Sequence, residues 1–375
     1  MADMIPFIDL AAQRARIRDD LDRRLDKVIE EGRYILGPEV KAFETKLAEF
    51  GEAPFALGCA NGTDALALPL MAWRLRTGDA VFVPSFTFAA SAEVVPWLGA
   101  DAVFVDIDPE TYNMDPASLE AAIEQTKADG KLNPVAVIAV DLFGQPADYP
   151  AIRALCDKHG LKLIADSAQG FGCTLHDRHP IHWADATTIS FYPAKPLGCY
   201  GDGGALLTKD EALFGLLKSL AVHGEGESRY EYARIGMNSR LDTMQAAVLL
   251  AKLEVFAEEI DGRNAAAQRY GDGFGDVVRP HKVIEGGRSV WAQYTIEVDD
   301  RDAFRASLQE RGVPTAVYYP IPLHEQPPYK RFTTAPGGLP VTERVAKRVV
   351  SLPMDGYLNG ERQDRVIDAV RAALA

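Results

Sequence analysis

The 375-residue sequence contains few of the features that mark secreted, membrane or zinc-binding proteins. Its four cysteines are widely spaced and form no C-x-x-C pair, so we expect reduced, buried thiols and no disulfide framework. No apolar run approaches the roughly 18 residues of a membrane-spanning helix, and the N-terminal segment has no basic region followed by a long apolar stretch. We therefore expect a soluble, cytoplasmic protein with no membrane partner.

Several ligand-binding motifs are missing as well. The seven histidines show no metal-ligand spacing such as H-E-x-x-H, so we expect no bound metal. The glycine cluster at 201–204 matches neither the P-loop nor the G-x-G-x-x-G fingerprint, which argues against a Rossmann dehydrogenase. The net charge of −14 argues against nucleic acid as a partner, although a locally positive site can still take an anionic substrate.

Short apolar segments alternate with helical ones between about residues 53 and 208. The apolar segments lie at 81–83, 102–107, 135–140, 162–165 and 187–191, and a further strand is expected at 205–208. Because they are apolar on both faces, they predict an α/β fold with a largely parallel sheet covered by helices. Two helices are expected before the sheet, at 13–31 and 38–50.

The rest of the chain predicts a second, smaller domain. A polar, glycine-containing loop is expected at 223–240, followed by a long helix at roughly 241–260 that links two domains. We place the large domain at residues 1–255 and a smaller C-terminal α/β domain at 256–375. Within the smaller domain the pattern predicts a strand at 291–298 and helices at 301–312 and 361–374.

One lysine, Lys195, lies between Pro193 and Pro196, just before the glycine cluster. Each proline fixes its φ angle and fits neither a helix interior nor a central strand, so Lys195 is expected on a loop of defined backbone. Most lysines are solvated surface charges. An amine held in this way, however, suits imine formation with an aldehyde, because burial lowers its pKa toward the neutral, reactive form. Such an amine can also transfer a proton as general base and acid.

Asp166 ends a buried apolar strand, and ligands of open α/β sheets bind beyond the carboxyl ends of strands. Its carboxylate either caps the next turn or partners the pyridine nitrogen of pyridoxal 5′-phosphate (PLP). Together with Lys195 it predicts a PLP enzyme, in which the lysine forms the Schiff base. Gln169, three residues later, is either a contact to the phenol oxygen of the cofactor or a plain surface amide.

The turn Asn61-Gly62-Thr63-Asp64 opens directly into an Ala/Leu-rich helix. Helix N-termini bind phosphate, so Gly62 and Thr63 are candidate phosphate ligands, the alternative being an ordinary N-cap. Ser190, close before the lysine, is a further candidate phosphate donor. Phe88 either stacks on the pyridine ring or belongs to the core.

Taken together, these segments resemble the DegT/DnrJ/EryC1/StrS sugar aminotransferases, which are PLP enzymes of the aspartate aminotransferase fold (fold type I) with a mostly parallel, seven-stranded type of sheet. The resemblance covers nearly the whole chain and is carried by residues 7–10, 34–38, 61–64, 84–88, 166–169, 190–204, 238–242 and 319–323. It implies a homodimer with shared active sites. It implies that Lys195 forms the Schiff base, that Asp166 contacts the pyridine nitrogen and that Gln169 contacts the ring oxygen of the cofactor. It further implies that Phe88 stacks on the ring. The phosphate would be bound by Gly62, Thr63 and Ser190, and by Asn238 of the neighbouring subunit.

Within that family, segments 34–40, 191–204 and 319–326 look most like bacterial 3-aminotransferases. The resemblance implies transfer of an amino group from glutamate to the 3-keto position of a UDP-linked 2-acetamido-hexuronic acid, in the biosynthesis of cell-surface polysaccharide such as O-antigen. Arg240 is a candidate for binding a substrate carboxylate, because its guanidinium fork fits one bidentately. Tyr319 and His324 are weaker candidates for substrate binding.

The sequence departs from these relatives at Phe143, Pro146 and Tyr318, which leaves the identity of the sugar open. Three other functions remain as alternatives. One is a PLP-dependent sugar dehydratase, which Lys195 disfavours because those relatives carry histidine at this position. The second is an aminotransferase for a 4-keto-6-deoxy nucleotide sugar. The third is a non-catalytic regulatory protein that keeps the fold.

Overall fold

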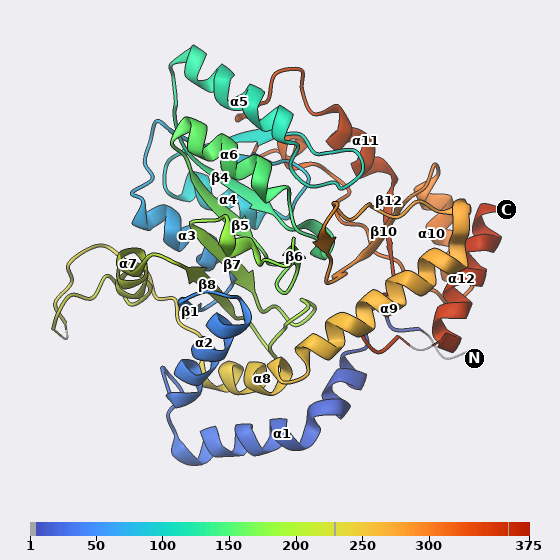
Figure 1. Ribbon diagram of the computed structural model, residues 1–375, viewed down its shortest axis with the longest axis horizontal. Coiled ribbons are helices and arrows are strands. Elements are labelled where there is room, and N and C mark those ends of the chain that lie inside the picture. Colours follow the sequence, from blue (N-terminus) through green and yellow to red (C-terminus); the bar gives the residue numbers. More distant parts are fainter. Residues whose placement is uncertain (1–4, 229, 359) are drawn as a thin grey trace.

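The computed structural model describes residues 5–228, 230–358 and 360–375, and a large sheet flanked by helices forms its centre (Figure 1). The strand order is β1-β8-β7-β5-β4-β2-β3-β11. The strands are β1 (Phe55–Cys59), β2 (Asp79–Pro84), β3 (Asp101–Val105), β4 (Asn133–Val140), β5 (Lys162–Asp166), β7 (Ala186–Ser190), β8 (Gly204–Thr208) and β11 (Thr333–Thr334). Only β8 is antiparallel to its neighbours, so the sheet is mostly parallel, as predicted.

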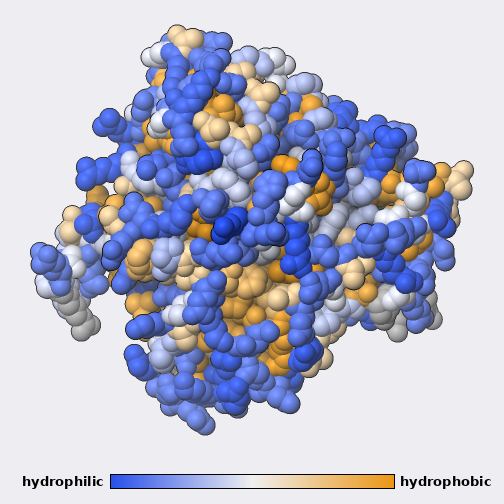
Figure 2. Space-filling view, in the orientation of Figure 1, coloured by the Kyte–Doolittle hydropathy of each residue, from blue (hydrophilic) through white to orange (hydrophobic). Residues whose placement is uncertain are grey.

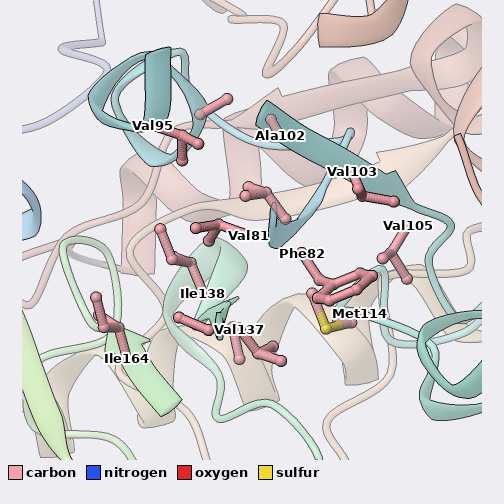
Figure 3. Close-up of a cluster of buried hydrophobic side chains, with 14 of the residues drawn as sticks. Val81, Phe82, Val95, Ala102, Val103, Val105, Met114, Val137, Ile138 and Ile164 are labelled. Atoms are coloured by element: carbon pink, nitrogen blue, oxygen red, sulfur yellow. The ribbon is translucent and has the colours of Figure 1, made fainter. Parts of the chain in front are cut away.

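The centre of the sheet is a dry core. Val81 and Phe82 of β2, Val103 of β3 and Ile138 of β4 pack together with side chains from the covering helices (Figure 3). All four side chains are almost fully buried. Strands covered on both faces must be apolar on both faces, and this is why the sequence showed unbroken Val/Ile/Ala runs at these positions.

Helices that connect the strands or pack on the sheet are α3 (Gly62–Ala72), α4 (Ala90–Trp97), α5 (Pro116–Asp129), α6 (Tyr149–His159) and α7 (Glu211–Ala221). Two more precede the sheet, α1 (Leu10–Glu31) and α2 (Pro38–Phe50), as the apolar stripes predicted. Leu21 of α1 packs against Val248 and Ala251 of α8 (Thr243–Leu253). Three-residue 3₁₀ turns lie at Leu142–Gly144, Pro180–His182, Gly275–Val277 and Leu323–Glu325.

The C-terminal part contains α9 (Phe256–Phe274), β10 (Tyr294–Glu297), α10 (Arg301–Glu310), α11 (Pro340–Arg348), β12 (Val349–Leu352) and α12 (Gly360–Leu374). Strands β10 and β12 form a small antiparallel sheet, and β6 (Thr174–Leu175) pairs with β9 (Gly287–Arg288). Tyr270 and Phe274 of α9 form a separate apolar core with Tyr294 and Val366. The strand predicted at 291–298 and the helices predicted at 301–312 and 361–374 are therefore present, with shifted ends.

The single helix expected at 241–260 was wrong. The chain forms two helices there, α8 and α9, because each packs in a different environment. Leu249 and Leu250 of α8 join the core beside α2, whereas the C-terminal half of α9 reaches the small C-terminal core. Since α9 contributes to both cores, the boundary between residues 255 and 256 stays a prediction.

The surface in this view is mostly hydrophilic, as the acidic composition predicts, and an apolar area is visible around α8 (Figure 2). Within the described residues, no helix combines the length and the apolar character needed to traverse a bilayer.

Candidate active site

A cavity of about 810 Å³ opens at the carboxyl ends of β4, β5 and β7. Its wall also includes the N-terminus of α3, the start of α4 and three residues from the C-terminal part: Gln293, Tyr318 and Tyr319. Eight of the eleven predicted site residues line this cavity, namely Gly62, Thr63, Phe88, Asp166, Gln169, Ser190, Lys195 and Tyr319. The structure thus brings together groups separated by more than 250 residues of sequence.

A second cavity, of about 680 Å³, lies at the opposite ends of the strands. Its cationic groups already have partners in the protein. Arg153 lies 3.1 Å from an Asp185 carboxylate oxygen, and Lys209 donates to the carbonyl of His182 at 2.7 Å. We therefore place the candidate active site in the cavity that contains Lys195.

Lys195 lies on a tight turn, as its two flanking prolines predicted. Its backbone N–H donates to the Tyr192 carbonyl at 2.8 Å. The base of the turn is closed by two more backbone bonds, from Phe191 to Gly203 and from Cys199 to Phe191. The lysine side chain faces the cavity, and burial among the surrounding protein atoms lowers its pKa, while the carboxylate of Asp166 opposes this effect. An amine with a lowered pKa is a better nucleophile near neutral pH.

Asp166 is the last residue of β5 and is 4% exposed. Its Oδ2 accepts a hydrogen bond from Ser91 Oγ at 2.7 Å, and its Oδ1 accepts one from the Ala168 N–H at 3.2 Å. Burial raises the pKa of this carboxyl, and both hydrogen bonds oppose that rise because they stabilise the charged form. A carboxylate in this position can balance a positive charge in the cavity.

The Gln169 side chain has a fixed orientation. Its Oε1 accepts from the Phe143 N–H at 2.9 Å, so its Nε2 must point the other way, where it donates to the Tyr319 hydroxyl at 2.9 Å. Because the Tyr319 oxygen accepts this bond, its own hydrogen is left for another acceptor. Burial raises the Tyr319 pKa, so the phenol stays protonated. A neutral hydrogen-bond donor therefore lies beside Gln169 on the cavity wall.

The cavity wall also includes the start of α3. Asn61 is the N-cap, and its Oδ1 accepts from the Asp64 N–H at 2.8 Å. Gly62 and Thr63 form the first turn, where N–H groups have no acceptor within the helix. A side chain at position 62 would approach Ser190 Cβ to 2.6 Å, so glycine lets the serine lie beside the helix N-terminus. The N-cap and the phosphate-binding readings of this turn are thus compatible.

These groups fit PLP on chemical grounds. The cavity is lined by a lysine amine, a buried carboxylate and a helix N-terminus with an adjacent hydroxyl. It is also lined by Phe88, which is 55% exposed although it is a large aromatic. An amine for an aldehyde, an acid for a pyridine nitrogen, a ring for stacking and amides for a phosphate are the groups that this cofactor requires.

Three predicted residues do not line the cavity of the single chain. Asn238 is exposed and pairs with Val222 through an isolated β-bridge, and Arg240 follows it two residues later. His324 is engaged elsewhere, since its Nδ1 lies 2.7 Å from Ser85 Oγ and its Nε2 lies 3.4 Å from a carboxylate oxygen of Glu343. The roles proposed for these three residues stay predictions.

Sequence reasoning missed two kinds of cavity residue. Thr87 and Ser91 lie next to the predicted Phe88, but serine and threonine are too common at helix starts to be a signal. Gln293 contributes a buried Oε1 with no hydrogen-bond partner among the described residues. It lies in the segment predicted as a strand at 291–298, and that pattern carried no signal of a cavity position.

Three comparisons agree with this geometry. The chain is 47% identical to the UDP-2-acetamido-2-deoxy-3-oxo-D-glucuronate aminotransferase of Pseudomonas aeruginosa, over 95% of this chain and 96% of that protein. It superposes on a DegT DnrJ EryC1 StrS aminotransferase from Brucella abortus with a TM-score of 0.97, at 51% identity and with 98% and 99% of the two chains covered.

A second similar structure is DesV of S. venezuelae in complex with a ketimine intermediate. It matches with a TM-score of 0.93 and 37% identity, and 99% and 98% of the two chains are covered. The model of one family matches residues 15–371, which is almost the entire chain. The protein therefore belongs to the DegT/DnrJ/EryC1/StrS aminotransferase family, as its motifs predicted.

Proposed function

We propose that this protein is a PLP-dependent aminotransferase that transfers an amino group from glutamate to the 3-keto position of a UDP-linked 2-acetamido-hexuronic acid. The observation that carries the proposal is the shared cavity of Lys195, Asp166 and the α3 N-terminus in a chain of this family. The substrate rests on the 47% identity to an aminotransferase with that type of substrate. Its product would supply amino sugar for a cell-surface polysaccharide.

In this proposal, each group that lines the cavity binds a different part of the cofactor. PLP, when bound, supplies an electron sink for the carbon that loses a proton. Lys195 would hold it covalently and Asp166 would neutralise its pyridine nitrogen. The remaining contacts are the Gly62 and Thr63 amides and the Ser190 hydroxyl for the phosphate, Phe88 for the ring face and Gln169 for the ring oxygen.

Lys195 is the residue that we expect to transfer protons in both halves of the reaction. The Lys195 Nζ atom lies in a buried environment that favours the neutral form of the amine. It therefore accepts a proton from glutamate and returns a proton in the second half of the reaction, when the keto-sugar is aminated. Burial keeps the Tyr319 phenol neutral, and the hydrogen bond from Gln169 orients it, so its hydroxyl can donate to a substrate oxygen.

The substrate end of the site is completed by a second subunit. Asn238 and Arg240 lie outside the cavity of their own chain, which supports a role across the interface of a homodimer. In that arrangement Asn238 of the partner subunit reaches the phosphate and Arg240 of the partner subunit reaches a carboxylate. The four cysteines are free and buried, which supports work in a reducing compartment such as the cytoplasm.

The test is a substrate panel. Purified protein is incubated with PLP, glutamate and several UDP- and dTDP-linked ketosugars, and the products are identified by mass spectrometry. We expect 2-oxoglutarate and a UDP-linked 3-amino sugar, and neither with the Lys195→Ala variant. A dTDP-linked 4-amino product would contradict the proposed sugar, and loss of water without 2-oxoglutarate would identify a dehydratase. A colourless preparation that takes up no PLP would point to the regulatory alternative.

A further inference from the structure

Two buried hydroxyl groups lie in a row behind the carboxylate of Asp166. Ser91 Oγ is 2.7 Å from Asp166 Oδ2, and Thr87 Oγ1 is 3.1 Å from Ser91 Oγ. Ser91 is 1% exposed and Thr87 is 2% exposed, although both border the same cavity as Lys195. Ser91 lies outside the segments that identified the site, and Thr87 lies within segment 84–88 but received no role there. The Ser91 hydroxyl bonds to Asp166 and to Thr87.

The direction of this hydrogen-bond chain follows from its chemistry. An ionised carboxylate has no hydrogen to give, so Ser91 must donate its single hydroxyl hydrogen to Asp166. The Ser91 oxygen can then only accept from Thr87, which makes Thr87 the donor of the second bond. The two bonds therefore run one way, from Thr87 through Ser91 to Asp166, and each donor polarises the next.

The local backbone explains how these groups reach the carboxylate. Thr87 lies in a bend three residues before α4 begins at Ala90, and Ser91 is the second residue of that helix. The Ser91 N–H donates to the Phe88 carbonyl at 3.3 Å, which closes the backbone between the two hydroxyls. Phe88, between them, is 55% exposed toward the cavity. This short segment thus presents an aromatic ring to the cavity, the Ser91 hydroxyl to Asp166 and the Thr87 hydroxyl to Ser91.

Asp166 needs such donors because its surroundings disfavour its charge. The titratable groups that face it are the Lys195 amine, the Tyr319 and Tyr149 phenols and the carboxyl of Asp141. Only Lys195 is a cation, and that charge is lost when the amine is neutral or bound in an imine. The Asp141 carboxyl cannot substitute for Ser91, because it is itself held by Tyr149 and Ser167.

Resting on the proposed function, we propose that Ser91 is a positioning residue, backed by Thr87, which keeps the Asp166 carboxylate ionised and aimed at the pyridine nitrogen of the cofactor. The Asp166 carboxylate accepts two hydrogen bonds, from Ser91 Oγ and from the Ala168 N–H, and these fix its plane. Its other lone pairs remain available to a group in the cavity. Ser91 touches neither cofactor nor substrate in this role.

Four variants of the holoenzyme test this: Ser91→Ala, Ser91→Thr, Thr87→Val and Thr87→Ser. The readouts are the pH dependence of the visible absorption band of the lysine–PLP imine and the rate of a single half-reaction with glutamate. Removing a hydrogen bond to a charged group costs about tenfold or more in the ionised fraction or in rate. For Ser91→Ala we expect PLP to bind, the half-reaction to slow about tenfold, and the acid limb of its pH profile to move upward by about one pH unit.

The conservative variants separate positioning from packing. Ser91→Thr keeps the hydroxyl and should restore the pH profile, and Thr87→Val should give a smaller upward shift that Thr87→Ser abolishes. Ser118→Ala changes a serine that does not line the cavity, so it is the control and should match the unaltered protein. Unchanged pH profiles for both Ser91→Ala and Thr87→Val would overturn the inference.

If the Ser91→Ala protein does not fold, the Thr87→Val and Thr87→Ser variants test the proposal. In that case, a Thr87→Val variant with the same pH profile as the unaltered protein refutes the proposal. Failure of the proposed function looks different, because the unaltered protein itself would then form no imine with PLP.

Discussion

At the scale of single residues, burial alone does not make a lysine the Schiff-base residue. Lys252 is 1% exposed and burial lowers its pKa to about 8, yet it lies over the Tyr200 ring, 4.5 Å from the centroid, and does not line the active-site cavity. Lys195 has a lowered pKa and also faces Asp166 across the cavity. If PLP binds in this cavity as proposed, only Lys195 is placed to react with its aldehyde.

We expect borohydride reduction of the PLP-loaded protein to attach the cofactor to Lys195 and not to Lys252. Peptide mass spectrometry of the reduced protein locates the adduct. The Lys195→Ala variant should carry no adduct, while Lys252→Met, which keeps the apolar stem of the side chain, should be labelled like the unaltered protein. Label at Lys252 in place of Lys195 would refute the assignment of the catalytic lysine.

A second residue-scale feature is the buried His281, which is 2% exposed and packs among the rings of Phe143, Trp291 and Tyr112. Its Nε2 has no hydrogen-bond partner among the described residues. Burial lowers its pKa from 6.5 to about 4, so the folded protein keeps the ring neutral. The unfolded chain binds the proton more readily, and stability is therefore lost as the pH falls from about 6.5 to about 4.

The expected loss is at most about 3 kcal/mol between these two pH values, from about 1.4 kcal/mol for each pH unit of the shift. Urea unfolding at pH 7 and at pH 4.5 measures it. His281→Phe, which fits an aromatic cluster, should reduce the pH dependence, whereas His182→Gln, at an exposed position, should leave it unchanged. Equal pH dependence in the unaltered and His281→Phe proteins would show that His281 does not titrate on unfolding.

At the scale of elements, Gly204 of the glycine cluster lies where the start of β8 packs against the N-terminus of α3. A Cβ atom on Gly204 would lie 2.4 Å from the carbonyl carbon and oxygen of Asn61, which are backbone atoms that cannot rotate away. The strand and the helix end can approach this closely only because position 204 has no side chain. The geometry of the proposed phosphate site at Gly62 thus depends on a residue that does not itself bind phosphate.

Gly204→Ala should therefore lower the melting temperature and weaken PLP binding together. Gly215 in α7 is the matched control, since a Cβ atom there would meet no atom within 4 Å. Gly215→Ala should raise stability by about 0.5–1 kcal/mol, because alanine favours a helix interior, and leave PLP binding unchanged. Thermal unfolding and PLP titration measure both effects, and a Gly204→Ala variant with unaltered PLP affinity would contradict this account.

The sequence predicted the elements best where local pattern and burial coincide. Strands such as β4 and β5 are apolar on both faces, and α2 begins and ends where its apolar stripe does. The break between α8 and α9 was not predictable, because it arises from packing against two different cores. Ser91 was missed for a similar reason, since its partner Asp166 lies 75 residues away in sequence.

At the scale of the whole molecule, two parts of the predicted site face outward. Asn238 is exposed, and Arg240 lies two residues before Asp242, which bridges to Ile35. Tyr34, Ile35 and Leu36 are each about half exposed although they are large and apolar. An exposed apolar segment beside a substrate-binding candidate is typical of a subunit interface, and this supports the proposed homodimer.

If each active site of the dimer uses Lys195 from one subunit and Arg240 from the other, the two residues can be mutated in different subunits of the same dimer. Lys195→Ala removes the catalytic amine of one chain, and Arg240→Ala removes the residue that we expect in the neighbouring site. Each variant alone should be inactive or nearly so. Co-expression and random pairing should restore about a quarter of the unaltered activity, because half of the dimers are mixed and each mixed dimer has one complete site. Aminotransferase assays of the purified mixtures, with each variant paired to itself as control, measure this. Activity that stays at the level of the separate variants would mean that Arg240 serves its own chain or neither site.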